Sequence, residues 1–278
     1  MHDWGDFMSE QLIGNLIIIG GAEDKENKKD ILKKVCSYID CNNDLLVIAT
    51  VATEYPKEVA NKYKKVFSSL NVKNIDVLDI ASREDSYKNK NIEIINKAKL
   101  IFFTGGDQLR ITSLIGGTPI FEKLQQKLNE GTYIVGTSAG ASVMSNTMIL
   151  EGKDQEAPKK SSIQMSPGFG FIKGVIIDQH FDQRGRIGRL LSIIAQNPEV
   201  LGIGIDENTA IIANYKDEIH VIGEGAVYFV DGSNITYTDV SDQNDNKVLS
   251  IFNIRLHVLK NGDKFSIFKK APIKEETI

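Results

Sequence analysis

The stretch YIVGTSAGASVMS, residues 133–145, determines the expected fold of this chain more than any other segment. It joins a short apolar run at 133–135 to a segment of small residues that is expected to begin a helix at Ala139. One glycine stands two positions before Ser138 and another two positions after it. This Gly-x-Ser-x-Gly spacing between a strand and a helix is typical of a tight turn that presents a serine hydroxyl above a sheet. Ser138 is therefore a candidate nucleophile.

Four further apolar runs precede this one and alternate with amphipathic stretches. The runs are rich in Ile, Val, Leu and Phe, as buried parallel strands are, and lie at 15–20, 45–50, 75–80 and 100–103. The stretches between them predict helices at 26–39, 57–68, 87–98 and 121–129. This alternation predicts an α/β fold with a doubly wound, mostly parallel sheet flanked by helices.

The second half of the chain has a different pattern, in which short alternating runs predict additional C-terminal strands. They lie at 202–205, 210–214, 218–223, 226–230 and 235–238, with a last pair at 254–259 and 264–268. Asn261-Gly262 separates the last two and favours a hairpin. We expect these strands to extend or flank the same sheet. Residues 1–278 would then form a single catalytic domain, with 1–13 as an N-terminal extension and 271–278 as a frayed tail.

Composition excludes several classes of protein. The chain has 278 residues, of which 33 are basic and 37 acidic, giving a net charge of −4. Mild acidity disfavours a nucleic-acid partner. The two cysteines, Cys36 and Cys41, match neither a disulfide framework nor a zinc site. The absence of a basic leader and of a long apolar segment predicts a cytoplasmic protein without a membrane segment. We expect neither a metal nor an organic cofactor.

A serine nucleophile needs a general base, and His180 is the candidate. It follows the apolar run 175–177, at the carboxyl end of an expected strand. His2 lies in the N-terminal extension, whereas His220 and His257 lie inside alternating strand patterns. The oxyanion of the reaction would be held by the backbone N–H groups of Ala139 and of Gly106, in the Gly-Gly turn after the fourth strand.

The acid that orients the base is left open by the residues alone. Glu207 follows another apolar run, and Asp154 and Glu156 lie in the loop after the helix that follows Ser138. The order of triad residues along the chain varies among unrelated folds, so order does not decide between them.

Three arginines, Arg184, Arg186 and Arg189, form a basic cluster beside the candidate base in an otherwise acidic protein. The apolar residues among them indicate that the segment is anchored. Guanidinium groups in this place are suited to holding substrate carboxylates.

The sequence resembles the cyanophycinases, serine peptidases related to dipeptidase E and, by fold, to class I glutamine amidotransferases and flavodoxin-like proteins. The matching stretches are GGAEDK (20–25), FTGGDQLRI (103–111), GTSAGASVMS (136–145), DQHFDQRGRIGRLL (178–191) and GIGIDENTA (202–210). The long match around His180 is the most specific of these.

The resemblance implies an exopeptidase that degrades cyanophycin, a poly-aspartate with arginine on each β-carboxylate, to β-aspartyl-arginine dipeptides. It implies Ser138 as nucleophile, His180 as base and Glu207 as acid, and a homodimer. Asp154 and Glu156 stay open, because in the dipeptidase E relatives the acid lies between serine and histidine. The positions that match the family's substrate pocket are Gln108, Asp178, Gln179, Arg184, Arg186 and Arg189.

Other functions are weighed against this one. A dipeptidase acting on short aspartyl peptides is the nearest alternative, and an inactive binding module of the same fold is a different class. Glutamine amidotransfer needs a cysteine where this chain has Ser138. A nucleotide-binding role is disfavoured because residues 20–24 lack the spacing of a phosphate-binding loop and include two acidic residues.

Overall fold

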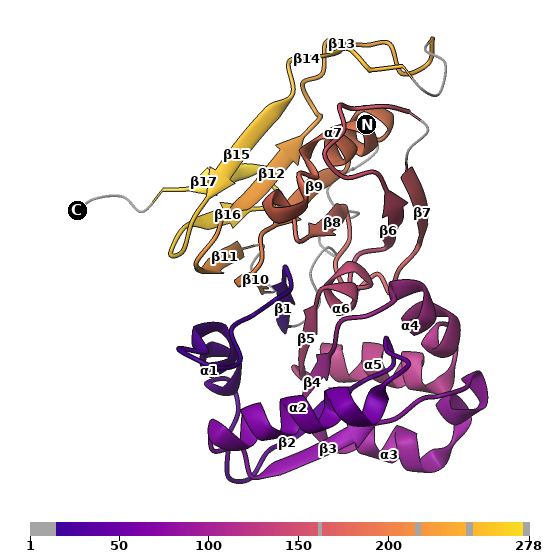
Figure 1. The fold of residues 1–278 in the computed structure, drawn as a ribbon, viewed down its shortest axis with the longest axis vertical. Coiled ribbons are helices and arrows are strands. Elements are labelled where there is room, and N and C mark those ends of the chain that lie inside the picture. The colour runs from indigo at the N-terminus through magenta and orange to yellow at the C-terminus, as the bar shows by residue number, and fades with distance from the viewer. Residues whose placement is uncertain (1–14, 161–162, 215–217, 243–246, 275–278) are drawn as a thin grey trace, which may run out of the picture.

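The computed structural model describes residues 15–160, 163–214, 218–242 and 247–274. These residues form a nine-stranded sheet in the order β17-β16-β11-β10-β1-β5-β4-β2-β3, together with a four-stranded sheet in the order β15-β12-β9-β8 (Figure 1). Neighbours from β1 to β3 pair in parallel. Strands β10, β11, β16 and β17 continue this sheet in antiparallel pairing. The predicted α/β fold with additional C-terminal strands is confirmed.

The strand bounds agree with most of the predicted runs. In the larger sheet the strands are β1 (Asn15–Ile19), β2 (Leu45–Ala49), β3 (Asn74–Leu78), β4 (Ala98–Phe103), β5 (Tyr133–Thr137), β10 (Thr209–Ala213), β11 (Glu218–Gly223), β16 (Lys264–Ser266) and β17 (Ala271–Ile273). In the smaller sheet they are β8 (Val175–Gln179), β9 (Leu201–Ile205), β12 (Val227–Asp231) and β15 (Arg255–Leu259). Two antiparallel ribbons join β6 (Thr147–Gly152) with β7 (Ile163–Pro167), and β13 (Tyr237–Thr238) with β14 (Ile251–Phe252).

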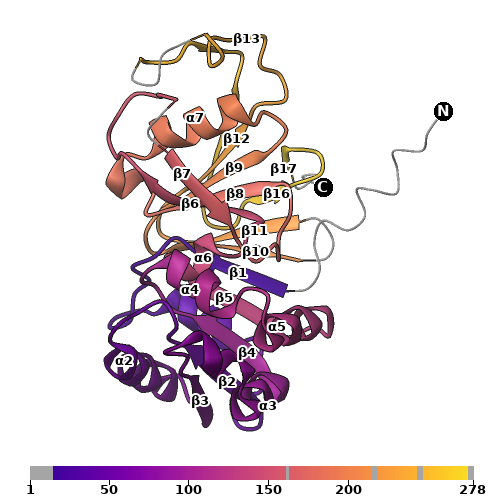
Figure 2. The same ribbon diagram turned by 90° about the vertical axis from the view of Figure 1, so that its right-hand side faces the viewer.

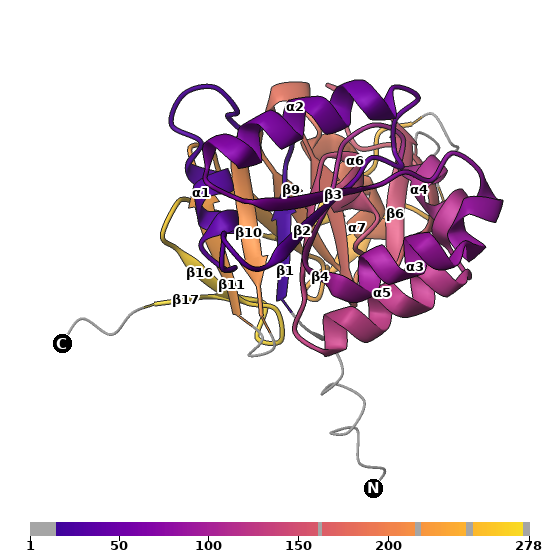
Figure 3. The same ribbon diagram turned by 90° about the horizontal axis from the view of Figure 1, so that it is seen from below.

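Helices cover both faces of the parallel strands because side chains alternate along each strand. Ile17 and Ile19 belong to the core that contains α1 (Asp30–Cys36) and α2 (Pro56–Ser69). Leu16 and Ile18 belong to the core on the opposite face. That face is covered by α3 (Asn89–Lys97), α4 (Gln108–Ile115), α5 (Pro119–Asn129) and α6 (Ala139–Ser142). Figure 3 shows the sheet between α2 and the pair α3 and α5.

The smaller sheet is packed against α7 (Ile187–Gln196), as Figure 2 shows. Leu190 and Ile194 of α7 are buried in one cluster with Val230 of β12. Two short 3₁₀ helices, η1 (Arg83–Tyr87) and η2 (Asp182–Arg184), precede α3 and α7. The β6–β7 ribbon and helix α4 were not predicted, and both contribute to the site described below.

Three predictions are wrong in detail. The tail expected to fray at 271–278 begins with β17, because Ala271–Ile273 pair with β16, and residues 275–278 lie outside the described part of the chain. The helix expected at 26–39 begins only at Asp30, because the Asp24 carboxylate accepts the backbone N–H groups of residues 26, 27 and 29 and stabilises a turn there. The strands on either side of Asn261-Gly262 do not pair with each other. Instead, β15 pairs with β12, whereas β16 pairs with β11 in the larger sheet. Phe265 stacks on Phe229 across the two sheets, with ring centroids 3.9 Å apart.

Candidate active site

Ser138 follows β5 in a strained turn. Its backbone has φ 53° and ψ −113°, a region that costs a side-chain-bearing residue about 1–3 kcal/mol. A Cβ atom on Gly136 would lie 2.1 Å from the carbonyl oxygen of Gly140, and one on Gly140 would lie 2.5 Å from that of Phe103. The glycine spacing therefore allows a turn that no larger residue would fit. Ser138 lies at the carboxyl edge of the sheet, directly before the first residue of α6.

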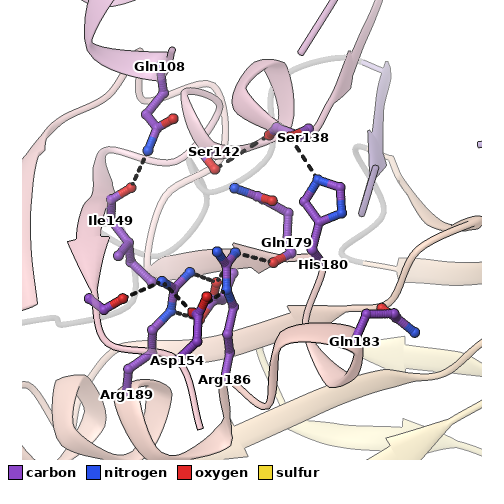
Figure 4. Close-up of polar contacts among 12 residues, drawn as sticks. Gln108, Ser138, Ser142, Ile149, Asp154, Gln179, His180, Gln183, Arg186 and Arg189 are labelled. Atoms are coloured by element: carbon purple, nitrogen blue, oxygen red, sulfur yellow. Dashed lines mark hydrogen bonds and ion pairs between the residues drawn. The ribbon is translucent and has the colours of Figure 1, made fainter. Parts of the chain in front are cut away.

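His180 approaches Ser138 from the smaller sheet. It follows β8, and its Nε2 lies 3.0 Å from Ser138 Oγ (Figure 4). Its Nδ1 lies 2.6 Å from Oε1 of Glu207, which follows β9. The site thus lies where the carboxyl ends of β5, β8 and β9 meet. The backbone N–H of Glu207 donates to Gln183 Oε1 at 2.9 Å, so η2 holds the glutamate in place.

The other two candidate acids lie elsewhere. Asp154 Oδ1 accepts from Arg186 Nε at 2.9 Å and lies 3.5 Å from Arg189 NH1. Glu156 forms ion pairs with Lys153 at 3.4 Å and Lys159 at 3.1 Å. Among these carboxylates, Glu207 is the one that the fold brings to the imidazole.

The surroundings of His180 favour its neutral form. Burial is the main cause that lowers the pKa of the imidazole, and the positive charges of Arg184 and Arg186 lower it further. The hydrogen bond to Glu207 opposes them. Because the net pKa lies below the ordinary value, the imidazole is free to accept a proton at neutral pH.

The three arginines differ in their contacts. Arg186 and Arg189 are 5% and 7% exposed and face the buried carboxylate of Asp178, which is 1% exposed. Arg189 Nε donates to Asp178 Oδ2 at 2.7 Å, and Arg186 NH1 donates to the carbonyl oxygen of Gln179 at 2.5 Å. Burial raises the pKa of Asp178 and lowers that of Arg186. The charges of this cluster are therefore matched within the protein.

Arg184, by contrast, is exposed on η2, close enough for its charge to lower the pKa of His180. No carboxylate in the part of the chain that the structure describes pairs with its guanidinium. Of the three arginines, this is the one whose charge is available to a ligand.

Two glutamines among the expected pocket residues lie near the serine. Gln108, the first residue of α4, donates through Nε2 to the carbonyl oxygens of Ile149 and Leu150 in β6, at 2.9 and 3.1 Å (Figure 4). Gln179 is 8% exposed, and its Oε1 has no hydrogen-bond partner among the described residues. Since buried polar atoms are normally paired, this oxygen is suited to accept from a ligand.

The two segments that carry the candidate oxyanion donors lie next to the serine. Ala139 is the next residue in the chain and opens α6. Gly106 follows Gly105, on which a Cβ atom would lie 3.2 Å from that of Ser138. The turn after β4 therefore lies against Ser138, as the sequence suggested.

Three residues that hold the site together have roles that the sequence did not predict. Asp154, a candidate acid in the sequence, binds the arginines instead. Gln183 binds the backbone of Glu207, and Gly21 lies against the imidazole. A Cβ atom on Gly21 would lie 2.4 Å from His180 Cε1. The Gly20-Gly21 pair was a visible signal for a close approach, whereas nothing in the sequence around Asp154 or Gln183 identifies a partner.

Residues 16–222 of the chain match peptidase family S51. The chain belongs to this family. Over 260 residues this S51 peptidase is 38% identical to a cyanophycinase from Geminocystis herdmanii, covering 93% of this chain and 96% of that protein. It is 35% identical to a cyanophycinase from Trichormus variabilis, covering 92% of this chain and 86% of that protein.

Solved structures support the same fold. A peptidase from an acI-B1 Actinobacterium superposes on this S51 peptidase with a TM-score of 0.67 at 20% identity, covering 92% of this chain and 98% of that one. A putative peptidase E from Listeria monocytogenes gives a TM-score of 0.54 at 16% identity, covering 76% and 99%. Within the described residues, no helix combines the length and apolar character needed to span a membrane.

Proposed function

We propose that this S51 peptidase is a cyanophycinase, a serine-type exopeptidase that hydrolyses cyanophycin to β-aspartyl-arginine dipeptides. The observation that carries the proposal is the chain of hydrogen bonds from Ser138 through His180 to Glu207. It occurs in a chain whose relatives named cyanophycinase are 35–38% identical over more than nine-tenths of its length.

In the proposed reaction Ser138 Oγ attacks the backbone carbonyl carbon next to the terminal β-linked residue. His180 Nε2 takes the hydroxyl proton, and the Glu207 carboxylate holds Nδ1–H and stabilises the imidazolium. The N–H groups of Ala139 and Gly106 hold the oxyanion of the tetrahedral intermediate. The leaving amine takes the proton from His180 as the acyl-enzyme ester forms. Water, activated by the same imidazole, then hydrolyses the ester and frees Ser138.

The residues around Ser138 suit a substrate that carries both a positive and a negative group. Each unit of the polymer has an arginine side chain, and the chain end adds a carboxylate. We assign the substrate carboxylate to Arg184, whose guanidinium is exposed beside the base. We assign the substrate guanidinium N–H groups to the unpaired Oε1 of Gln179. Gln108, Asp178, Arg186 and Arg189 then shape the pocket through their contacts with one another and with β6.

The test compares purified protein with cyanophycin and with α-linked aspartyl dipeptides, and follows the products by mass spectrometry. We expect β-aspartyl-arginine from the polymer and no cleavage of the α-linked dipeptides. Ser138→Ala should lower kcat by about 10⁶-fold, leaving binding and the oxyanion donors intact. Cleavage of the dipeptides alone would instead indicate a dipeptidase of the peptidase E type, to which a Nostoc relative is 24% identical over 187 residues.

A fluorophosphonate probe separates this proposal from an inactive binding module of the same fold. The wild type should be labelled and Ser138→Ala should not. Absence of both labelling and hydrolysis would favour the inactive module.

We also propose that the protein acts as a homodimer in the cytoplasm, as the resemblance implies. Leu256 and Val258 on the edge strand β15 are 50% and 56% exposed, and such a row of apolar side chains favours contact with a second copy. Light scattering of the purified protein tests the dimer, and a monomer mass at micromolar concentration would contradict it.

A further inference from the structure

The last residue of β1 and the two residues after it bind the backbone at or next to each member of the proposed triad. Three successive carbonyl oxygens accept backbone N–H groups from them: Ile19 from Ser138 at 3.1 Å, Gly20 from His180 at 2.8 Å, and Gly21 from Asn208, next to Glu207, at 2.9 Å. The segment that follows β1 carries the residues GGAED at 20–24, for which the proposed reaction has no role.

Glu23 in this segment is a buried acid, 3% exposed, that takes no direct part in the proposed reaction. Its Oε2 accepts from the hydroxyl of Thr137 at 2.5 Å. Its Oε1 accepts from the hydroxyl of Tyr63 at 2.5 Å and lies 2.8 Å from Lys25 Nζ. Both oxygens therefore face donors, and these contacts offset the cost of burying the carboxyl group.

The donors tie Glu23 to two rigid elements. Tyr63 belongs to α2 and packs on Phe67 and Phe102 in the core. Burial and the neighbouring Glu23 raise the pKa of Tyr63, so its hydroxyl stays a donor. Thr137 is the last residue of β5 and directly precedes the strained backbone of Ser138. Glu23 thus fixes the residue from which the turn at Ser138 begins.

We propose that Glu23, acting through the Thr137 hydroxyl, is a positioning residue for the nucleophile. The carboxylate holds the end of β5 so that Ser138 keeps the left-handed backbone that points Oγ at His180. The inference rests on the proposed role of Ser138 as nucleophile, and Glu23 itself touches neither substrate nor imidazole.

The test removes the hydrogen bond between Thr137 and Glu23 while keeping the size of the side chain at position 137 nearly the same. Thr137→Val should slow acylation by a fluorophosphonate probe and lower kcat on the polymer by about 10- to 100-fold, as small misplacements of reacting groups do, with KM unchanged. Thr137→Ser restores the hydroxyl and should recover most of the rate. Glu23→Gln should have a similar effect, and the double variant should be no slower than the slower single variant, because both changes break one contact.

Thr132→Val is the matched control. Thr132 is also buried, its hydroxyl donates to the carbonyl oxygen of Ala98, and it directly precedes the other end of β5. It should match Thr137→Val in melting temperature and keep the wild-type acylation rate. Wild-type acylation in folded Thr137→Val, equal slowing in both variants, or a change confined to KM would overturn the proposal. If the wild type is neither labelled nor active, the proposed function and this inference fail together.

Discussion

Arg189 Nε donates to Asp178 Oδ2 at 2.7 Å, in an ion pair whose carboxylate side chain is fully buried. Arg186 lies against the same carboxylate, and Asp154 contacts both arginines from the other side. The DQHFDQRGRIGR stretch, residues 178–189, therefore supplies two arginines and one carboxylate of a charge-matched cluster, and Asp154 supplies the second carboxylate. Removing one member would leave a buried charge without its partner.

Asp178→Asn should accordingly destabilise the protein by about 3–5 kcal/mol, the usual cost of breaking a buried ion pair from one side. Urea unfolding followed by circular dichroism measures the change. Glu130→Gln is the control, because Glu130 pairs with Lys127 at 3.6 Å on the surface and should lose less than about 1 kcal/mol. If the two variants had the same free energy of unfolding, the buried cluster would contribute no more to stability than a surface ion pair.

Glu207→Gln should lower kcat by about 10⁴-fold, because an amide no longer stabilises the imidazolium or fixes the tautomer of His180. The contact with Glu207 raises the pKa of His180, so its loss should also move the acid limb of the profile of kcat/KM against pH to lower pH. Asp154→Asn, which removes a charge from the arginines, should leave kcat far less affected. A larger loss in Asp154→Asn would place the acid of the triad there instead.

Arg184→Ala tests the substrate contact and the electrostatics together. We expect KM for the polymer to rise, because the exposed guanidinium no longer holds a carboxylate. Since the charge of Arg184 lowers the pKa of His180, its removal should move the acid limb to higher pH, opposite to the shift in Glu207→Gln. Arg184→Lys keeps the charge and should keep the limb in place. An unchanged KM in Arg184→Ala would remove this residue from the substrate site.

The parts of this site that the sequence predicts are those encoded over a few consecutive residues. Gly136, Ser138 and Gly140 predict the turn through their spacing alone, and a side chain on Gly136 would meet the backbone of Gly140 only four positions on. The position of His180 is also predicted from neighbouring residues. It follows the apolar run 175–177, and the end of such a run predicts the end of a strand.

Contacts between residues that are far apart in the sequence cannot be predicted from a few neighbouring residues. Glu207 is 27 positions from His180 in the sequence. The sequence around Asp154 was equally compatible with a role as the acid that orients His180. Likewise Asn261-Gly262 makes a local turn, in which Asp263 N donates to the Lys260 carbonyl at 3.0 Å. Which sheet each flanking strand joins is set by distant partners, such as Phe229 under Phe265.

Gly21→Ala is expected to reduce activity because the added side chain would clash with His180. Its φ of 103° strains any side chain, and the added Cβ would meet His180 Cε1 at 2.4 Å, so the imidazole must move. Gly131→Ala separates the two effects, because Gly131 has φ 87° and open space around its Cβ position. Both variants should lose about 1 kcal/mol or more of stability from the backbone. Turnover of the polymer should fall by about 10²-fold in Gly21→Ala, as displaced catalytic groups cause, and stay at the wild-type level in Gly131→Ala. Equal turnover in the two variants would mean that the imidazole does not need the space that Gly21 leaves for it.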